Sequence, residues 1–303
     1  MDRNFRKLAL QKLAERQDRS LEISSRVALT RPNVNFDLKK MAGRLADLVR
    51  GSLDGDSDFR TKFLSMKPGP ERERFVLQEI MRRKPIPQLV PVTVPGPKGT
   101  KITYKVMPDY ITLDGLRVPM SGQTAQKVAD HFGMVLPTKK QVDQILENAK
   151  VRIRPTPLSA GGKIDGRYYS GQEVVSGMIG DSRSAAAYSD LIEQELQNKK
   201  YKGGLVAGHM KDIIQPSNDP NKLGLYGWHG QDDKPLEPSV TTGHDTAVHA
   251  EYGAGARLID EDVIITAPDG TKFKSKMSDL QQHPVFYQAV SDKPGRLKYQ
   301  STN

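Results

Sequence analysis

Three short motifs between Gly208 and His249 carry most of the side chains that could do chemistry. They read GHMKD from Gly208, LYGWH from Leu225 and TGHD from Thr242. Four of the six histidines and the only tryptophan of the chain lie in this stretch. Imidazole changes its protonation near neutral pH, so this density of histidine favours a catalytic or ligand-binding site.

The candidate residues fall into two groups by side-chain type. The catalytic candidates are His209, Lys211, His229 and His244. They would supply a base, an acid and a cation for a developing oxyanion. The substrate-binding candidates are Tyr226, Trp228 and Arg257. The two aromatic rings would form a stacking wall for a sugar or a peptide. Strand alternation would place His209 and Lys211 on one face and Asp212 on the other.

A metal-dependent version of this site uses the imidazoles as ligands. His209, His229 and His244 would bind a metal and leave one position open for water. No HExxH pattern accompanies them, so we prefer the version without a metal and leave the metal and any cofactor undefined. The chain has no cysteine, which excludes disulfides, thiolate metal sites and cysteine nucleophiles. It also lacks a G-x-S-x-G elbow and the glycine-rich phosphate loops.

The elements that must position these residues indicate an α+β fold in two parts. Residues 1–84 show helical periodicity, including a short turn with Phe59 and Phe63 and a helix that begins at Pro70. They predict a basic helical arm or small helical domain. Prolines from Pro85 to Pro97 mark a change to short strands. Residues 85–303 are predicted to form an α+β domain, with a mainly antiparallel sheet that carries the histidine-rich stretch.

Within the second part, three helices and two hairpins are predicted. Helices are expected over 124–132, 138–149 and 184–199, and hairpins near 92–107 and, as the last element, 262–276. Residues 151–180 are expected to form a long exposed excursion. Thr138 and Gln141 have capping-box spacing, so we interpret Thr138 as a helix cap and not as a nucleophile.

The charge of the chain is concentrated near its beginning. Residues 1–90 hold 20 basic and 12 acidic residues, which gives this segment +8 of the net charge of +10. Charges of both signs are interleaved there, so a solvated or protein-docking face is preferred. Nucleic acid is allowed as a partner but has no recognised motif behind it. No apolar run is long enough to span a membrane, and no secretory signal is visible. The expected location is therefore the cytoplasm by default, or wherever a route without a signal peptide delivers the protein.

A longer run of motifs resembles a known group of sequences. The run from Asp109, DYITLDGLRVPMSGQTAQKVADHFGMVLPTKKQVDQI, is followed by GHMKDIIQ, LYGWH, KPLEP and GH. This order resembles a family of uncharacterised bacterial proteins with a TAQ-A-LG-LPT-K-VD block, GH-KD, YGWH, a GKPIQP-like loop, a further histidine and a YSHG-R-L ending. The resemblance covers roughly residues 85–260 and implies relatives without implying an activity. Ala254 stands where the family pattern has a histidine; if that histidine is essential, this chain is impaired unless His249 substitutes.

Two classes of function follow from the histidine stretch. The first hypothesis is a hydrolase or transferase that acts on a cell-envelope polymer such as peptidoglycan, with His209 and His229 as acid and base. The alternative is a non-enzymatic structural or binding module of a virion or secretion apparatus, in which the histidines are structural. The directions of the histidine side chains distinguish the two, because an enzyme needs them to converge on one open cleft.

Overall fold

The computed structural model describes residues 59–156, 158, 163–164, 167–168, 181–230, 232–238, 246 and 249–300. The helices predicted before residue 59, most of the predicted excursion and the candidate His244 lie outside the described residues. All described elements belong to the unit Ser57–Asn303.

Two helices open the described part. They are α3 (Phe59–Ser65) and α4 (Pro70–Arg83), at the predicted positions. Proline at the first position of α4 fits because that position has no helical hydrogen bond to donate. Their buried residues, such as Phe63 and Ile80, share one core with Ile111 and Leu116 of the next segment. The core therefore does not stop at residue 84, and the proposed division of the chain there stays a prediction.

The first sheet confirms both predicted hairpins. Its strand order is β1 (Val90–Pro95), β2 (Lys101–Val106), β14 (Ile259–Thr266) and β15 (Lys272–Lys276), with β5 (Met134–Val135) also paired to β14. All of these pairs are antiparallel. The chain does not end on this hairpin as predicted, because β15 runs directly into α9 (Met277–Gln282). Met277 and Leu280 of α9 pack into the core beneath the sheet.

The second sheet carries the candidate motifs. Its order is β12 (Pro235–Glu237), β11 (Gly224–His229), β10 (Lys211–Ile214) and β13 (Ala254–Gly255). Only the pair of β10 and β13 is parallel. Lys211 lies opposite Gly227 on one side and Ala254 on the other. The motifs GHMKD and LYGWH are thus brought together by hydrogen-bonded neighbouring strands.

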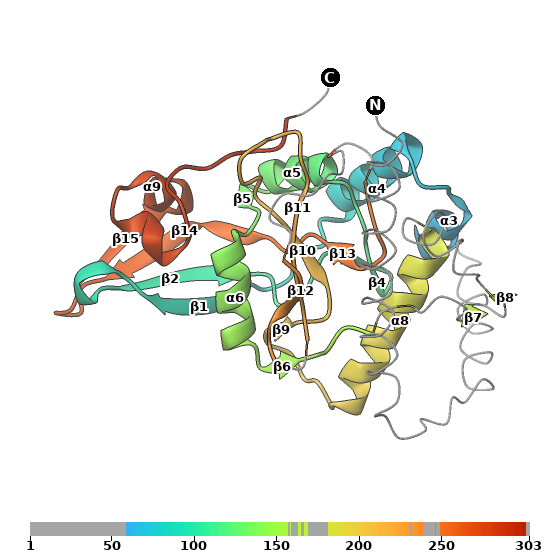
Figure 1. Cartoon of the computed structure of the whole chain (residues 1–303), viewed down its shortest axis with the longest axis horizontal. Coiled ribbons are helices and arrows are strands. Elements are labelled where there is room, and N and C mark those ends of the chain that lie inside the picture. Colours follow the sequence, from blue (N-terminus) through green and yellow to red (C-terminus); the bar gives the residue numbers. More distant parts are fainter. Residues whose placement is uncertain are drawn as a thin grey trace, which may run out of the picture. The chain divides into compact units, whose positions relative to one another are not determined.

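Three longer helices complete the fold where helical spacing predicts them. They are α5 (Gly122–His131), α6 (Lys139–Asn148) and α8 (Ser182–Asn198). Helix α6 contacts both sheets, through β1 and β11, and lies between them in Figure 1. Short pairs make up the rest: β3 (Thr112–Leu113) with β4 (Leu116–Arg117), β6 (Val151–Arg152) with β9 (Val206–Ala207), and β7 (Lys163–Ile164) with β8 (Arg167–Tyr168). The α+β prediction is confirmed, and in the described ranges no helix is long and apolar enough to cross a membrane.

Thr138 provides a test of the capping interpretation. Its hydroxyl accepts a hydrogen bond from the amide of Gln141 and donates one to the carbonyl of Val290, at 2.6 Å. We expect Thr138→Ala to lower the free energy of unfolding by about 1–2 kcal/mol, because two buried groups lose their partner. Thr138→Ser keeps the hydroxyl and should recover most of this loss. Chemical denaturation of both variants measures the difference; equal losses would show that the hydroxyl is not what matters.

Candidate functional site

The glycines of the two motifs are required by the backbone. Gly208 has a φ of +95°, and a Cβ atom there would lie 2.8 Å from the carbonyl oxygen of Ile153. Gly227 has a φ of +121°, and the next residue, Trp228, has a φ of 55°. Side chains other than hydrogen are disfavoured in this region of φ. These glycines therefore shape the chain around the site and say nothing about a ligand.

His209 lies in the bend before β10 and is wholly buried. Its Nε2 is 3.0 Å from Oδ1 of Asp109, and Oδ2 of the same carboxylate is 2.6 Å from Nη2 of Arg117. The side chain of Arg117 is also buried. The Asp109 carboxylate thus lies between His209 and Arg117. Because the imidazole of His209 is wholly buried, the predicted role of His209 as an exposed acid or base does not fit its position.

The contacts of His209 indicate a neutral ring. Burial lowers the pKa of His209, and the opposing effect of Asp109 does not outweigh it. Burial alone would raise the pKa of Asp109, but His209 and Arg117 bring it well below its ordinary value. The geometry fits Nε2–H donating to the carboxylate. Nδ1 has no hydrogen-bond partner among the described residues, and an imidazolium would leave a buried N–H unsatisfied there, which costs more than an unused lone pair.

A second set of buried side chains lies next to His209, beginning with Tyr110. Tyr110 donates its hydroxyl to Oδ2 of Asp212 at 2.7 Å, and its ring lies edge-on to His209. The guanidinium of Arg257 lies 4.4 Å from the centre of the Tyr110 ring, and its Nη2 donates to the carbonyl of Val206 at 2.7 Å. We name as the buried cluster the six residues Asp109, Tyr110, Arg117, His209, Asp212 and Arg257. Arg257 is wholly buried, so it is not placed to contact a substrate as predicted.

A different group of charged residues lies partly exposed at β10. Nζ of Lys211 is 2.6 Å from Oε1 of Glu251 and 3.4 Å from Oε2 of Glu237. The other carboxylate oxygen of Glu251 is 3.6 Å from Nε2 of His249. Lys211 also lies over the Trp228 ring, 4.7 Å from its centre. We name as the rim cluster these five residues: Lys211, Trp228, Glu237, Glu251 and His249.

The two clusters overlap in exposure, because the Asp109 side chain is 20% exposed. The side chain of His249 is 20% exposed, whereas that of Glu251 is 11% and that of His209 is 0% exposed. Burial alone would raise the pKa of Glu251, but hydrogen bonding to His249 and the charge of Lys211 lower it overall. Glu251 is therefore a carboxylate held ionised between an imidazole and an ammonium group.

The indole of Trp228 joins the two clusters. Its Nε1 donates to the hydroxyl of Tyr188 at 2.7 Å and to the backbone carbonyl of His209 at 3.1 Å. The Tyr188 hydroxyl donates to the same carbonyl. Trp228 is half-buried, and Lys211 covers one face of its ring. A sugar could contact only the remaining exposed part of the ring, so the stacking surface is smaller than predicted.

The third predicted histidine, His229, borders the buried cluster at Asp212, but its own ion pair is with another carboxylate. The His229 side chain is buried, with Nε2 3.6 Å from Oδ1 of Asp143. Tyr226 donates its hydroxyl to the same carboxylate oxygen at 2.9 Å. Tyr226 is also buried and lies opposite Asp212, whereas Trp228 lies over Lys211. The two rings of the predicted stacking wall are thus in different places.

Among the described residues, the structure keeps the candidates apart instead of converging them on one cleft. His209 is in the buried cluster, Lys211 and Trp228 are in the rim cluster, and His229 contacts Asp143. Sequence reasoning missed the carboxylates. Glu251 could have been found from its spacing of two residues after His249, whereas Asp109 lies 100 residues from His209 and no local pattern connects them.

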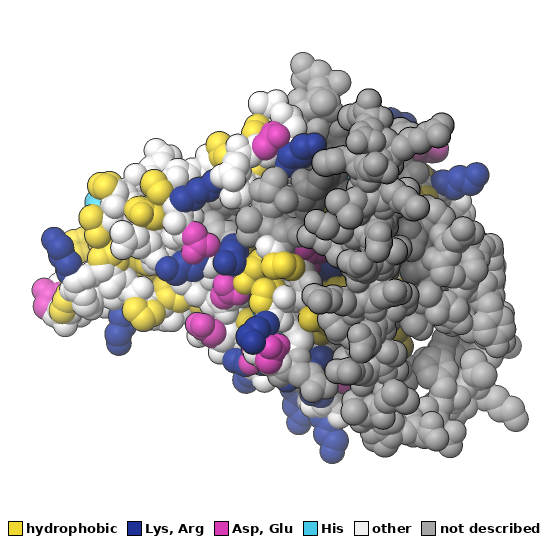
Figure 2. Space-filling model, in the orientation of Figure 1, with side chains coloured by type: hydrophobic (Ala, Val, Ile, Leu, Met, Phe, Trp, Pro, Cys, Tyr) yellow, Lys and Arg dark blue, Asp and Glu magenta, His cyan; other side chains and the backbone are white. Residues whose placement is uncertain are grey.

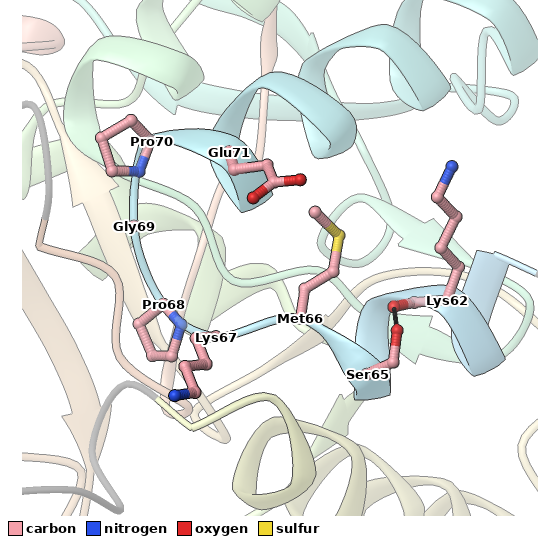
Figure 3. Close-up of a pocket in the computed structure, with 8 residues that line it drawn as sticks. All are labelled: Lys62, Ser65, Met66, Lys67, Pro68, Gly69, Pro70 and Glu71. Atoms are coloured by element: carbon pink, nitrogen blue, oxygen red, sulfur yellow. Dashed lines mark hydrogen bonds between the residues drawn. The ribbon is translucent and has the colours of Figure 1, made fainter.

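Neither cluster coincides with a metal-binding group of the described residues or with the hollow in Figure 3. Within the described ranges, no group of three or more His, Asp or Glu side chains could hold a metal ion. A hollow of about 580 Å³ lies beside the loop between α3 and α4 (Figure 3). It is lined by residues between 62 and 71, and none of the predicted site residues is among them. The hollow is therefore separate from both clusters.

Comparisons with protein-family models, with curated protein sequences and with solved structures found no match. The family resemblance described from the motifs therefore stays a proposal.

Gly208→Ala tests whether the first motif glycine is structural. We expect this variant to lose more stability than Gly270→Ala, which is a matched control. Gly270 also has a positive φ, of 88°, but a Cβ atom there would meet nothing within 4 Å. Backbone strain of about 1 kcal/mol is common to both, and the clash with Ile153 adds to it only at position 208. Thermal unfolding of both variants measures the difference. Equal losses would contradict the account of Gly208.

The neutral state of His209 predicts a pH dependence of stability. A group whose pKa is lowered in the folded protein binds its proton more readily when unfolded, so stability is lost as pH falls below about 6.5. The loss attributable to one such group is at most about 1.4 kcal/mol for each pH unit. We expect the free energy of unfolding of wild type to fall more steeply between about pH 6.5 and pH 5 than that of His209→Gln. Parallel slopes in urea titrations at several pH values would contradict a neutral, buried His209.

Proposed function

We propose that the protein is a hydrolase or transferase of amide bonds in a cell-envelope polymer such as peptidoglycan, and that the rim cluster is its reactive centre. The observation that carries the proposal is the position of Glu251. This largely buried carboxylate contacts an imidazole and an ammonium group that are both partly exposed. A base whose orientation is fixed by a carboxylate, next to a cation, is an arrangement suited to acyl transfer.

In this proposal His249 is the general base and Glu251 is a positioning residue. His249 takes a proton from water as the water oxygen attacks the amide carbon and forms the new C–O bond. The electron pair of the carbonyl moves to its oxygen, whose negative charge is stabilised by Lys211. The oxyanion pair then re-forms the carbonyl, the C–N bond breaks with its electron pair on nitrogen, and the proton passes from His249 to the leaving amine. In a transferase, a second amine would replace water as the nucleophile.

The strand register supports this choice of centre. Position 254, where the family pattern has a histidine, lies directly opposite Lys211 on β13. An imidazole at position 254 would lie on the strand next to Lys211 of the rim cluster. Ala254 is buried in this chain, so His249 is proposed to supply the imidazole from the segment that precedes β13. The substrate class itself follows from the sequence hypothesis and from the partly exposed indole of Trp228.

The alternative is a non-enzymatic structural or binding module of a virion or secretion apparatus. The specific observation in its favour is that His209, Tyr226 and Arg257 are buried and satisfied mainly by protein groups. A protein in which every charged group serves packing would show the same ion pairs. Activity measurements on folded variants distinguish this alternative from the enzyme.

His249→Gln is the decisive variant for the proposed reaction. We expect it to lower kcat/KM for amide cleavage in purified peptidoglycan fragments by about a hundredfold or more, because Gln cannot accept the proton. Its melting temperature should stay close to that of wild type, since the side chain is partly exposed. Glu251→Gln should also lose activity and should change the pH profile of kcat/KM. His131→Gln, at an exposed histidine in α5, is the matched control and should be fully active.

Two results would contradict the proposal. The first is a wild-type protein that releases no product from peptidoglycan fragments of defined composition. The second is equal activity of wild type and His249→Gln. A loss of activity in His209→Gln at unchanged melting temperature would instead restore His209 as a catalytic candidate.

A further inference from the structure

The outward face of the first sheet is rich in lysine. Ile102, Tyr104 and Val106 of β2 point into the core that α6 and α9 cover, so the alternating residues point outward. The outward lysines are Lys101 and Lys105 on β2 and Lys272, Lys274 and Lys276 on β15. We name these five residues the lysine face. The sheet lies at the left in Figure 1, and the face of that lobe seen in Figure 2 carries hydrophobic side chains with scattered basic and acidic ones.

Strand register arranges these lysines in two columns. Lys101 and Lys272 are both opposite Thr266 of β14, so they lie two strand spacings apart, or about 10 Å. Along β15, outward lysines follow one another at about 7 Å. Between the columns, β14 presents Ile264, Thr266 and Asp262, and the charges of the adjacent Asp260 and Glu261 also act on Lys276. The face is therefore a regular array of positive charge.

Little of this charge is neutralised. Asp262 pairs with Lys276 at 2.5 Å, and no other lysine of the face has an ion pair within the described part of the chain. The pKa of Asp262 is lowered by its hydrogen bond to Lys276, with Lys274 and Lys105 acting in the same direction. Four lysines thus surround one neutralised pair.

Protection of a sheet edge does not account for the whole lysine face. Lysines on an edge strand discourage pairing with another chain, which explains those on β15. Strand β2 is an interior strand, paired with both β1 and β14, so Lys101 and Lys105 guard no edge. Edge protection therefore does not account for Lys101 and Lys105, and their outward, exposed positions are consistent with binding of a polyanion.

We propose that the lysine face binds a flexible phosphodiester polymer of the cell envelope, a polyol phosphate chain, through its phosphate groups. Lysine ammonium groups bind phosphate as point charges and need no defined orientation. Outward residues of these strands include no aromatic side chain or arginine on which a base could stack. A flexible chain can follow both columns of a twisted sheet, whereas a stiff duplex would meet fewer lysines. The envelope location rests on the proposed function.

Binding of poly(glycerol phosphate) to the full chain tests the proposal. The variant Lys101→Gln, Lys272→Gln, Lys274→Gln removes three unpaired charges from the face. Its matched control is Lys199→Gln, Lys200→Gln, Lys202→Gln, which removes three exposed lysines at the end of α8. We expect the face variant to bind about tenfold more weakly or worse at low salt. Its slope of log K against log salt concentration should fall by about 2, since about 0.7 ion is released per contact on a single strand.

The other outcomes separate the lysine-face proposal from its alternatives and from the proposed reaction. Equal losses in the two triple variants would show that net charge alone is responsible. A short DNA duplex that binds as tightly as the polymer, with the same loss in the face variant, would assign the face to nucleic acid. A wild type that cleaves peptidoglycan but does not bind poly(glycerol phosphate) would overturn only the lysine-face proposal. The reverse result, with binding intact and no cleavage, would overturn only the proposed reaction.

Discussion

The contact of the Asp109 carboxylate with the buried side chains of His209 and Arg117 is the constraint on which the rest of the site depends. Removing a charged group from water costs several kcal/mol, and only close partners offset that cost. Arg117 at 2.6 Å and His209 at 3.0 Å are those partners. Breaking a buried pair typically costs about 3–5 kcal/mol, and removal of Asp109 would take this partner from the buried guanidinium of Arg117. The segment that contains His209 is therefore fixed by Asp109, from a distant part of the chain.

Fixing His209 also fixes the residues that reach the surface. The backbone carbonyl of His209 accepts hydrogen bonds from Trp228 and Tyr188, and the Trp228 ring lies beside Lys211. The buried cluster thus helps to determine where the rim cluster lies, although His209 itself is wholly buried. This division explains how a histidine can be central to the site without taking part in chemistry.

Local patterns in the sequence predicted the elements well and the site poorly. The capping box at Thr138 and the hairpins at 92–107 and 262–276 depend on neighbours within a few residues, and all three are confirmed. Which face of the sheet a side chain points to depends on regular alternation along its strand. A φ of 55° at Trp228 breaks the alternation, so Trp228 and Tyr226 do not share a face as a regular strand would require. His209 precedes its strand, and its partner Asp109 lies too far along the chain for any spacing to reveal.

The protonation of His209 tests the central claim most directly. Nitrogen-15 NMR of the histidine rings in the full chain, recorded from about pH 5 to pH 8, reports the charge and tautomer of each ring. We expect the His209 ring to be neutral at pH 6.5, with a proton on Nε2 and none on Nδ1. A His209 ring that titrates near pH 6.5 with both nitrogens accessible to water would contradict a buried, structural histidine. It would return His209 to the list of groups able to do chemistry.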